Sequence, residues 1–289
     1  MLKFYGAHIN GGIEKALLYS EKYDFNSAQI MPTAPIRWAL KDIDTGKLEQ
    51  TISGIDKGKL KLKKILIHGI YLVNLARKEK QKFHLSKVSL LNYLNYADFL
   101  QRTIESYGLD IEILGVCFHP GSAIDLDEQE GLVRVVEGLD WILEEYDGSI
   151  KLLLESSAGA GNVLGDKLEE LAEMRELSKY SKRIGFVLDT QHMWASGYDW
   201  RRPENLFSEI EKVLQFENIK AIHLNDTKTE LGSRKDRHDN LFDGLLGEGA
   251  VKEIVKREEL ENIPLIMETP DLGSEKGIRR EIEKIKSII

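Results

Sequence analysis

The stretch "RIGFVLDTQHMWASGYD", Arg183 to Asp199, joins a short apolar run to polar residues directly after it. The segment from Ile184 to Leu188 is apolar with little alternation, which is typical of a strand covered on both faces of its sheet. The run ends at Asp189, and His192 follows three residues later. Residues at the carboxyl ends of parallel strands face the mouth of an α/β fold, where the chemistry of such folds takes place.

Seven further apolar runs lie along the chain, separated by longer amphipathic stretches. In chain order the eight runs are "LKFYGAHIN" (2–10), "AQIMPT" (28–33), "KILIHG" (64–69), "LGVCFHPG" (114–121), "KLLLESS" (151–157), "RIGFVLDTQH" (183–192), "AIHLND" (221–226) and "PLIMETP" (264–270). Apolar residues at helical spacing predict helices over 90–108, ended by Gly108, and over 132–147. Strands that alternate with helices in this way favour a (β/α)8 TIM barrel over a doubly wound sheet. We therefore expect a single α/β domain spanning residues 1–289.

Residues that can bind metals recur at the ends of these runs. Six of the seven histidines lie at a strand end or in the loop after a strand. The residues at or near the run ends are His8, His68, His119, Glu155, Asp189, His192, His223 and Glu268. Because the strand ends of a barrel meet in one mouth, these carboxylates and imidazoles need a compensating charge, which a divalent metal provides. We expect a metal site at the C-terminal face of the strands.

Other candidate residues have structural interpretations. His8 is expected to support the site without binding metal, and His84 lies in a helical stretch as an ordinary surface residue. Cys117 lies in the middle of a run and is expected to be a small core residue, not a nucleophile. The lysine run "DKGKLKLKK" (56–64) is interpreted as a solvated helix end.

Composition limits the environment and the partners. A single cysteine excludes internal disulfides, and the N-terminal segment has no signal-peptide pattern. No apolar run approaches the roughly 20 residues that a membrane span needs. We therefore expect an intracellular, cytoplasmic protein with no membrane partner. The net charge of −8 is weak evidence against a nucleic-acid partner, so such a partner requires local evidence.

Seven segments together carry a resemblance to one known family. They are "GAH" (6–8), "HGIYLVNLA" (68–76), "FHPGS" (118–122), "LLLESSAGAGNVLG" (152–165), "LDTQHMWASGYD" (188–199), "HLNDTKTELGSRKDRH" (223–238) and "PLIMET" (264–269). In order and over nearly the whole chain, they resemble the endonuclease IV family of apurinic/apyrimidinic (AP) DNA endonucleases. The segment "GSRKDRH" (232–238) is highly specific.

This resemblance implies a barrel whose mouth holds three zinc ions. The matching ligands are His68 and His119 for the first zinc, Glu155 as its bridge to the second, Asp189, His223 and Glu268 for the second, and His192, Asp236 and His238 for the third. Glu155 and Glu268 are the residues assigned to catalysis. Residues two apart in an extended chain point to one side, so Asp236 and His238 can share a metal.

The resemblance also implies a reaction and a substrate. The family cuts DNA on the 5′ side of an abasic site, leaves 3′-hydroxyl and 5′-deoxyribose-phosphate ends, and removes blocked 3′ ends. Two metals about 3.5–4 Å apart suit the hydrolysis of a phosphodiester. We expect a zinc-dependent AP endonuclease of base excision repair, a monomer that acts on double-stranded DNA with abasic sites or blocked 3′ ends.

In that family, side chains wedge into the kinked duplex after the abasic nucleotide is flipped out. Tyr71 and Leu72 match two of these wedges. In "TAPIRW" (33–38), Ile36 occupies the position of the family's inserting arginine. Arg37 is a candidate to replace that arginine after a small shift of the loop.

Two further departures from the family concern the metal loops. Gln191 stands where the family frequently has cysteine, and we expect no effect on the metals. Phe242 stands where the family prefers glycine, which leaves a different path open to the loop that holds the third zinc.

A sugar isomerase or epimerase of the same barrel class is the main alternative. The residues that such enzymes share with this chain, and that suffice for one metal, are Glu155, Asp189, His223 and Glu268. The residues for which a one-metal isomerase has no use are His68, His119, His192, Asp236 and His238. A non-catalytic binder of damaged DNA would keep the fold and the wedges but lose ligands, and none is missing.

Overall fold

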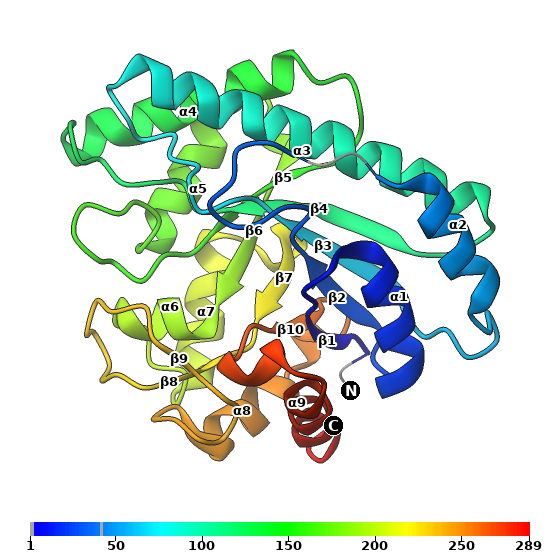
Figure 1. Ribbon diagram of the computed structural model, residues 1–289. Helices are drawn as coiled ribbons and strands as arrows, with labels where there is room; N and C mark the ends of the chain where they lie inside the picture. The colour runs from blue at the N-terminus through cyan, green and yellow to red at the C-terminus, as the bar shows by residue number, and fades with distance from the viewer. Residues whose placement is uncertain (1–2, 41–42) are drawn as a thin grey trace.

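A closed barrel of parallel strands forms the centre of the computed structural model, which describes residues 3–40 and 43–289 (Figure 1). The barrel strands are β1 (Tyr5–His8), β2 (Ser27–Ile30), β3 (Lys64–His68), β4 (Glu112–Phe118), β5 (Leu152–Glu155), β6 (Ile184–Asp189), β7 (Ile219–His223) and β10 (Leu265–Met267). Their order around the barrel is β1-β10-β7-β6-β5-β4-β3-β2. Each predicted run coincides with one strand, and only Leu2 of the first run lies outside the described residues. The predicted TIM barrel is confirmed.

Helices alternate with the strands and surround the barrel (Figure 1). They are α1 (Gly12–Tyr23), α2 (Thr45–Gly54), α3 (Lys80–Ser106), α4 (Glu128–Glu144), α5 (Leu168–Leu177), α6 (Thr190–Ala195), α7 (Pro203–Val213), α8 (Gly247–Val255) and α9 (Glu275–Lys286). The predicted helices at 90–108 and 132–147 correspond to α3 and α4, although α3 begins earlier than predicted. Gly108 has a φ of 70°, the left-handed conformation that ends many helices. Among the described residues, no helix is long and apolar enough to cross a membrane.

Two layers of apolar side chains form the core. Successive residues of a strand point to opposite faces of the sheet. In β3, Ile65 and Ile67 therefore belong to the larger cluster that includes the helices, while Leu66 belongs to a separate cluster of strand residues. This smaller cluster consists of Leu66, Leu114, Cys117, Leu153, Val187, Ala221 and Ile266. Cys117 is fully buried in it, as predicted for a small core residue.

The interpretation of the lysine run 56–64 as a helix end is wrong. Helix α2 ends at Gly54, and the run is a turn followed by extended chain that leads into β3. Its lysines bind neighbouring loops, since the Lys57 ammonium donates to the Tyr107 carbonyl and Lys63 pairs with Asp110 at 2.9 Å. These contacts with residues about 50 positions along the chain stabilise the extended conformation, and local periodicity in the sequence does not reveal them.

Gly6 allows β1 and β2 to approach closely, and replacing it should destabilise the barrel. A Cβ atom at this position would lie 1.5 Å from the carbonyl oxygen of Ser27, its partner in β2. We expect Gly6→Ala to lower the free energy of unfolding by about 3 kcal/mol or more, because a backbone carbonyl cannot move aside as a side chain can. Urea unfolding followed by circular dichroism measures the change.

The control is Gly249→Ala in α8, where no atom lies within 4 Å of the added methyl group. This exposed helical position should gain up to about 1 kcal/mol from the higher helix propensity of alanine. Equal stability of the Gly6 variant and the wild type would contradict the close approach of the two strands.

Candidate metal centre

The structure brings all nine predicted ligands to one end of the barrel. Six of them are the last residue of a barrel strand or the residue after it: His68, His119, Glu155, Asp189, His223 and Glu268. The other three come from segments outside the barrel. His192 lies in α6. Asp236 lies in the segment that joins the short strands β8 (Asp226–Thr227) and β9 (His238–Asp239), and His238 begins β9.

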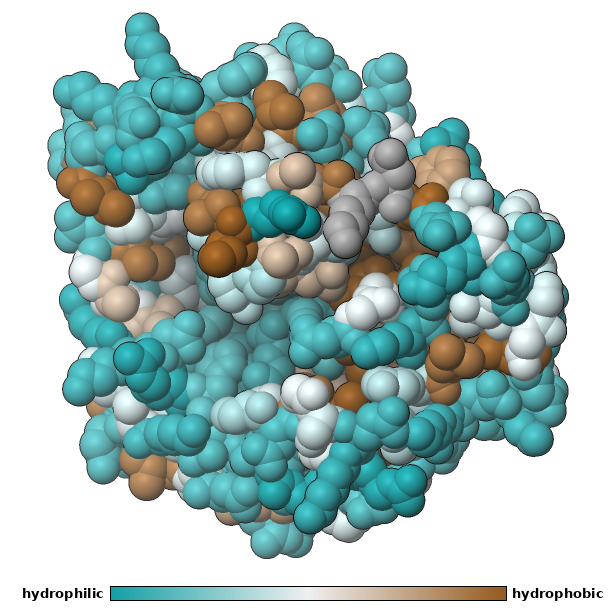
Figure 2. All heavy atoms as spheres, in the orientation of Figure 1, coloured by the Kyte–Doolittle hydropathy of each residue, from teal (hydrophilic) through white to brown (hydrophobic). Residues whose placement is uncertain are grey.

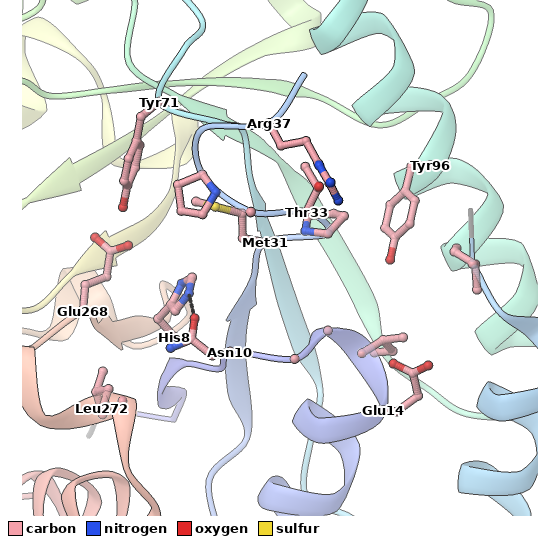
Figure 3. Close-up of a pocket in the computed structure, with 18 of the residues that line it drawn as sticks. His8, Asn10, Glu14, Met31, Thr33, Arg37, Tyr71, Tyr96, Glu268 and Leu272 are labelled. Atoms are coloured by element: carbon pink, nitrogen blue, oxygen red, sulfur yellow. Dashed lines mark hydrogen bonds between the residues drawn. The ribbon is translucent and has the colours of Figure 1, made fainter. Parts of the chain in front are cut away.

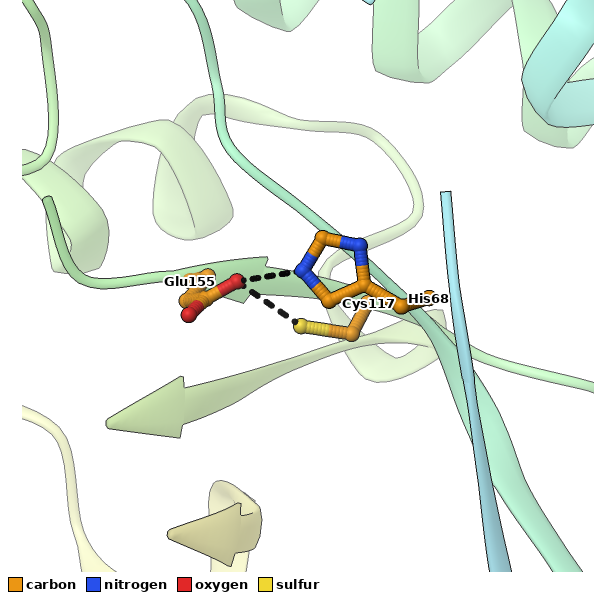
Figure 4. A group of neighbouring side chains, drawn as sticks. All are labelled: His68, Cys117 and Glu155. Atoms are coloured by element: carbon orange, nitrogen blue, oxygen red, sulfur yellow. Dashed lines mark hydrogen bonds and ion pairs between the residues drawn. The ribbon is translucent and has the colours of Figure 1, made fainter. Parts of the chain in front are cut away.

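The carboxylate of Glu155 lies at the centre of the cluster and is fully buried. Its Oε2 atom is 2.9 Å from His68 Nε2 and 3.5 Å from His119 Nε2. Its other oxygen, Oε1, is 2.8 Å from His223 Nδ1. The Cys117 thiol donates a hydrogen bond to Oε2 at 3.4 Å, so this core residue also contacts the site (Figure 4). Glu155 therefore faces both expected zinc positions that it would bridge.

A second group surrounds His223. Its Nδ1 atom is 3.2 Å from Glu268 Oε2 and 3.8 Å from Asp189 Oδ2. Together with Glu155, these residues place one ligand atom each within 4.8 Å of one another. The four-residue set predicted for the second zinc is thus assembled.

A third group lies beside the first two. Asp236 Oδ2 is 3.5 Å from His192 Nε2, and Asp236 Oδ1 is 3.5 Å from His238 Nε2. His238 Nε2 is also 3.7 Å from Asp189 Oδ2. The His238 Nε2 atom is buried and has no hydrogen-bond partner among the described residues. These three residues are the set predicted for the third zinc.

Hydrogen bonds orient the imidazoles so that one ring nitrogen of each faces a carboxylate. His68 donates from Nδ1 to the Gly69 carbonyl at 2.6 Å, and His192 donates from Nδ1 to the Ser156 carbonyl at 2.9 Å. In both residues Nε2 then faces a carboxylate oxygen. A backbone carbonyl on the far ring nitrogen is common among metal-bound histidines.

The charges in the cluster shift one another's pKa values. Burial alone would raise the pKa of the Glu155 carboxyl, but His119 and His223 hold it well below its usual range. Burial alone would lower the pKa of His223, but Glu268 and Glu155 raise it to about 9. Burial alone would raise the pKa of Glu268, but His223, together with His68 and His8, lowers it to about 2. The carboxylates are therefore ionised, which is the form that binds cations.

The spacing of these atoms fits divalent metal ions. Zinc bonds of about 2.0–2.2 Å to nitrogen and oxygen place the ligand atoms of one tetrahedral shell about 3.4 Å apart. The separations of 3.2 and 3.8 Å around His223 bracket that value, and those of 3.5 and 3.7 Å around His238 lie slightly above it. The distance of 2.8 Å between His223 Nδ1 and Glu155 Oε1 is shorter. The unpartnered His238 Nε2 fits the same interpretation. These residues could hold more than one metal ion.

Asp189 links the strand end to the second metal group, which explains the pattern at the tip of β6. Its Oδ1 atom caps α6 by accepting the backbone N–H groups of Gln191 at 2.7 Å and His192 at 2.9 Å. Its Oδ2 atom accepts a hydrogen bond from Asn225 Nδ2 at 2.6 Å. Sequence analysis missed Asn225, which also accepts the backbone N–H of Glu268. Its only signal was its place in "HLND", just after a strand-end histidine.

Gln191 connects two segments of the site, and its expected lack of effect on the metals stays a prediction. This residue is fully buried, and its Nε2 atom donates to the Lys235 carbonyl at 2.9 Å. The bond ties α6 to the loop that carries Asp236 and His238. Phe242, farther along the same segment, has a φ of 70°. Glycine adopts this left-handed conformation without strain and phenylalanine does not, so the backbone at Phe242 has the conformation that glycine favours.

The predicted DNA-contacting residues lie around the mouth. The side chains of Ile36 and Tyr71 are 77% and 61% exposed, Leu72 is half-buried and Arg37 is exposed. The Tyr71 N–H donates to the Pro35 carbonyl at 2.9 Å, so the two loops that carry these residues are in contact. The Tyr71 ring lies edge-on to His68, with 5.8 Å between ring centroids.

A cavity of about 820 Å³ lies next to the metal cluster and shares Tyr71 and Glu268 with it (Figure 3). Thr33 and Arg37 line it, Tyr96 lies farther from Glu268, and His8 lies near Glu268. The face shown in Figure 2 is mostly hydrophilic and is hollowed near its centre.

Known proteins match this chain over almost its whole length. Residues 17–288 match the family described as xylose isomerase-like TIM barrel. The chain is 32% identical to the "Probable endonuclease 4" of Chloroflexus aurantiacus, over 99% of this chain and 98% of that protein. Endonuclease IV from Thermus thermophilus has the same fold, with a TM-score of 0.79 and 25% identity over 99% of this chain and 98% of that one. A D-tagatose 3-epimerase-like protein shares the fold at 17% identity, with a TM-score of 0.69 over 99% and 97% of the two chains.

The barrel and its ring of imidazoles and carboxylates define a protein of the xylose isomerase-like TIM-barrel class. Within that class, the chain belongs to the endonuclease IV (endonuclease 4) family of enzymes, which it matches from end to end.

The Gln191 bond to the Lys235 carbonyl makes a local prediction. Gln191→Leu removes a hydrogen bond of about 1 kcal/mol, which should raise amide hydrogen exchange about fivefold in the segment 228–239. Mass spectrometry of peptic fragments measures the exchange. Helix α4, which Gln191 does not contact, is the internal control. Unchanged exchange in 228–239 would show that other bonds hold the loop.

Proposed function

We propose that this chain is a zinc-dependent AP endonuclease that hydrolyses the phosphodiester 5′ to an abasic site in double-stranded DNA. The products would be a 3′-hydroxyl and a 5′-deoxyribose phosphate, and blocked 3′ ends would be trimmed at the same site. The observation that carries the proposal is the convergence of nine ligand-type residues, including Asp236 and His238, at the mouth of the barrel. The names of the relatives, endonuclease 4 and endonuclease IV, support it.

We propose three zinc ions, held by the three groups of side chains. His68, His119 and Glu155 would hold one, Glu155 with Asp189, His223 and Glu268 a second, and His192 with Asp236 and His238 a third. When bound, zinc lowers the pKa of water to near 7 and stabilises negative charge on phosphate oxygens. All nine residues belong to one barrel domain, and we propose that a monomer acts on DNA inside the cell.

The residues of the chain would hold these ions and position the DNA. Glu155 and Glu268 are the carboxylates nearest to His223 and would act in catalysis by fixing the centre at which the phosphodiester is cut. The segment 232–238 exposes Arg234, Lys235 and Arg237 beside the site. These cations would attract the phosphate backbone locally despite the net charge of −8.

We propose that Tyr71, Leu72 and Ile36 fill the gap that a flipped abasic nucleotide leaves in the base stack. Two of these side chains are more than half exposed, and their loops touch through the Tyr71 N–H bond to Pro35. An apolar Ile36 can fill such a gap but cannot bind a phosphate. Arg37, exposed beside it, would supply that contact.

A sugar isomerase is not favoured by these observations. The residues around His223 would suffice for such an enzyme, but the third group would then have no use. The similarity to the epimerase-like protein, at 17% identity, concerns the fold.

The decisive experiment is incision of a duplex that carries one tetrahydrofuran abasic analogue. We expect about three zinc ions per chain by elemental analysis and cleavage 5′ to the analogue, which prolonged treatment with a strong chelator abolishes and added zinc restores. One metal per chain, together with no cleavage, would overturn the proposed function.

The third group of ligands has a separate test. Asp236→Asn with His238→Ala removes two ligands of one ion, and the loss of its charge stabilisation should cost several kcal/mol, at least about a hundredfold in turnover. The matched control is His84→Ala with Asp147→Asn, an exposed pair outside the site. Circular dichroism must show that both double variants are folded. Near-normal incision by the first would refute a role for the third ion.

The wedge role of Tyr71 predicts a preference for damaged DNA. Stacking against a base is worth about 1–3 kcal/mol, so Tyr71→Ala should weaken binding to abasic duplex about tenfold and change binding to intact duplex little. Fluorescence anisotropy at fixed salt measures both affinities. Phe99→Ala, at a partly exposed aromatic residue on α3, is the control. Equal losses on the two duplexes would mean that Tyr71 is not a wedge.

A further inference from the structure

Gln29, in β2, is a buried residue that contacts two of the predicted ligands without being a ligand itself. Its Nε2 atom donates to Glu268 Oε1 at 2.5 Å and to His8 Nδ1 at 3.0 Å. Its Oε1 atom accepts a hydrogen bond from His223 Nε2 at 2.7 Å. Both amide hydrogens and the amide oxygen are therefore used, in a side chain with no solvent exposure.

The contact with Glu268 determines which way the amide points. A carboxylate only accepts hydrogen bonds, so the amide nitrogen must face Glu268 and the oxygen must face His223. His223 Nε2 then donates to the amide oxygen of Gln29, and Nδ1 faces the carboxylates of Glu155 and Glu268. The amide of Gln29 thus orients the ring of His223 and the carboxylate of Glu268.

His8 and Asn10 continue the chain of hydrogen bonds away from the site. His8 Nδ1 accepts the second amide hydrogen of Gln29, so its Nε2 is free to donate to Asn10 Oδ1 at 3.3 Å. Every hydrogen bond in this series runs the same way: His223 donates to Gln29, Gln29 donates to His8, and His8 donates to Asn10. His8 thereby holds Gln29 and has no direct contact with the ligands through this bond.

His223 differs from the other oriented imidazoles in the nature of its partner. His68 and His192 donate to backbone carbonyls, which no substitution removes. His223 donates to a side-chain carbonyl, that of Gln29. The orientation of the ligand at the centre of the four-residue group therefore depends on one replaceable residue.

We propose that Gln29 is a positioning residue of the metal centre, which holds His223 and Glu268 in the geometry that binds the second ion. The proposal rests on the proposed function, since it assigns Gln29 to the same metal centre. Partners of this kind typically change metal affinity by 10–100-fold when they are removed. Without the amide, His223 can present either ring nitrogen and Glu268 can rotate away from Glu155.

The test measures metal retention directly. Gln29→Met keeps the volume of the side chain and removes its three hydrogen bonds. The zinc-loaded variant should release metal to the chromogenic chelator 4-(2-pyridylazo)resorcinol at least about tenfold faster than the wild type. Gln29→Asn is a second variant, because its amide is one methylene too short to reach Glu268 and His223 at once, and it should change release in the same direction.

Gln101→Met is the matched control. Gln101 Nε2 donates to Glu105 at 2.8 Å and to the Ile111 carbonyl at 3.0 Å, and its Oε1 accepts the Ile113 N–H at 2.7 Å. This variant therefore removes the same number of hydrogen bonds at the opposite end of β4 from His119. Gln101 is partly exposed, so this control tests the loss of a hydrogen-bonded amide outside the site. A purely structural effect of that loss would appear in it as well, but metal release should stay at the wild-type rate.

The outcomes separate this proposal from the function on which it rests. A wild-type protein that holds no zinc and leaves abasic DNA intact would refute the proposed function. A wild type that holds zinc and incises, with both Gln29 variants releasing metal as slowly as Gln101→Met, would overturn the positioning role and leave the function standing. Faster release in the folded Gln29 variants, verified by circular dichroism, supports the proposal.

Discussion

The buried carboxylate of Glu155 is the constraint on which the mouth of the barrel depends. An unpaired charge with no solvent exposure would cost many kcal/mol, so its surroundings must supply positive charge. Three imidazoles face it, with ring nitrogens 2.8 to 3.5 Å from its two oxygens. The neighbouring carboxylates raise the pKa of two of them, His68 and His223, which favours their charged form. They belong to β3, the end of β4 and β7, which means that strands far apart in sequence must end at the same level. The register of the barrel strands therefore determines whether Glu155 meets the imidazoles that surround it.

Much of the fold and most of the candidate site could be predicted from the sequence, because each predicted ligand on the barrel lies at the end of a short apolar run. That signal is local. The short apolar run indicates a strand, and the polar residue after it marks the carboxyl end of that strand at the mouth of the barrel. Gln29 gave no such signal, since it lies inside a run and its partners are 194 and 239 residues away. Which side chains meet across the barrel depends on closure and register, which periodicity does not encode. The lysine run 56–64 was misinterpreted for a related reason, as its lysines bind loops that follow α3.

The segments outside the barrel are held by a separate set of bonds. Asp189 ends β6 and caps α6, which turns His192 toward Asp236. The loop of Asp236 is then fastened to α6 by the Trp194 indole, which donates to the Thr229 carbonyl at 2.8 Å, and by the Arg234 N–H, which donates to the Ala195 carbonyl at 2.9 Å. Gln191 adds its bond to Lys235. A few hydrogen bonds to one short helix thus place two ligand-type residues against a barrel that is complete without them.

This division explains how one barrel class can support different chemistry. The four residues around His223 all stand at strand ends, so any member of the class with the same strands can present a comparable set. His192, Asp236 and His238 come from α6, from the segment after β8 and from β9, which can change in length and sequence without disturbing the pairing of the barrel strands. The ends of the barrel strands supply the other six ligand-type residues, including His68 and His119. The bonds that hold α6 and the segment after β8 are therefore as much a part of the proposed activity as the ligands themselves.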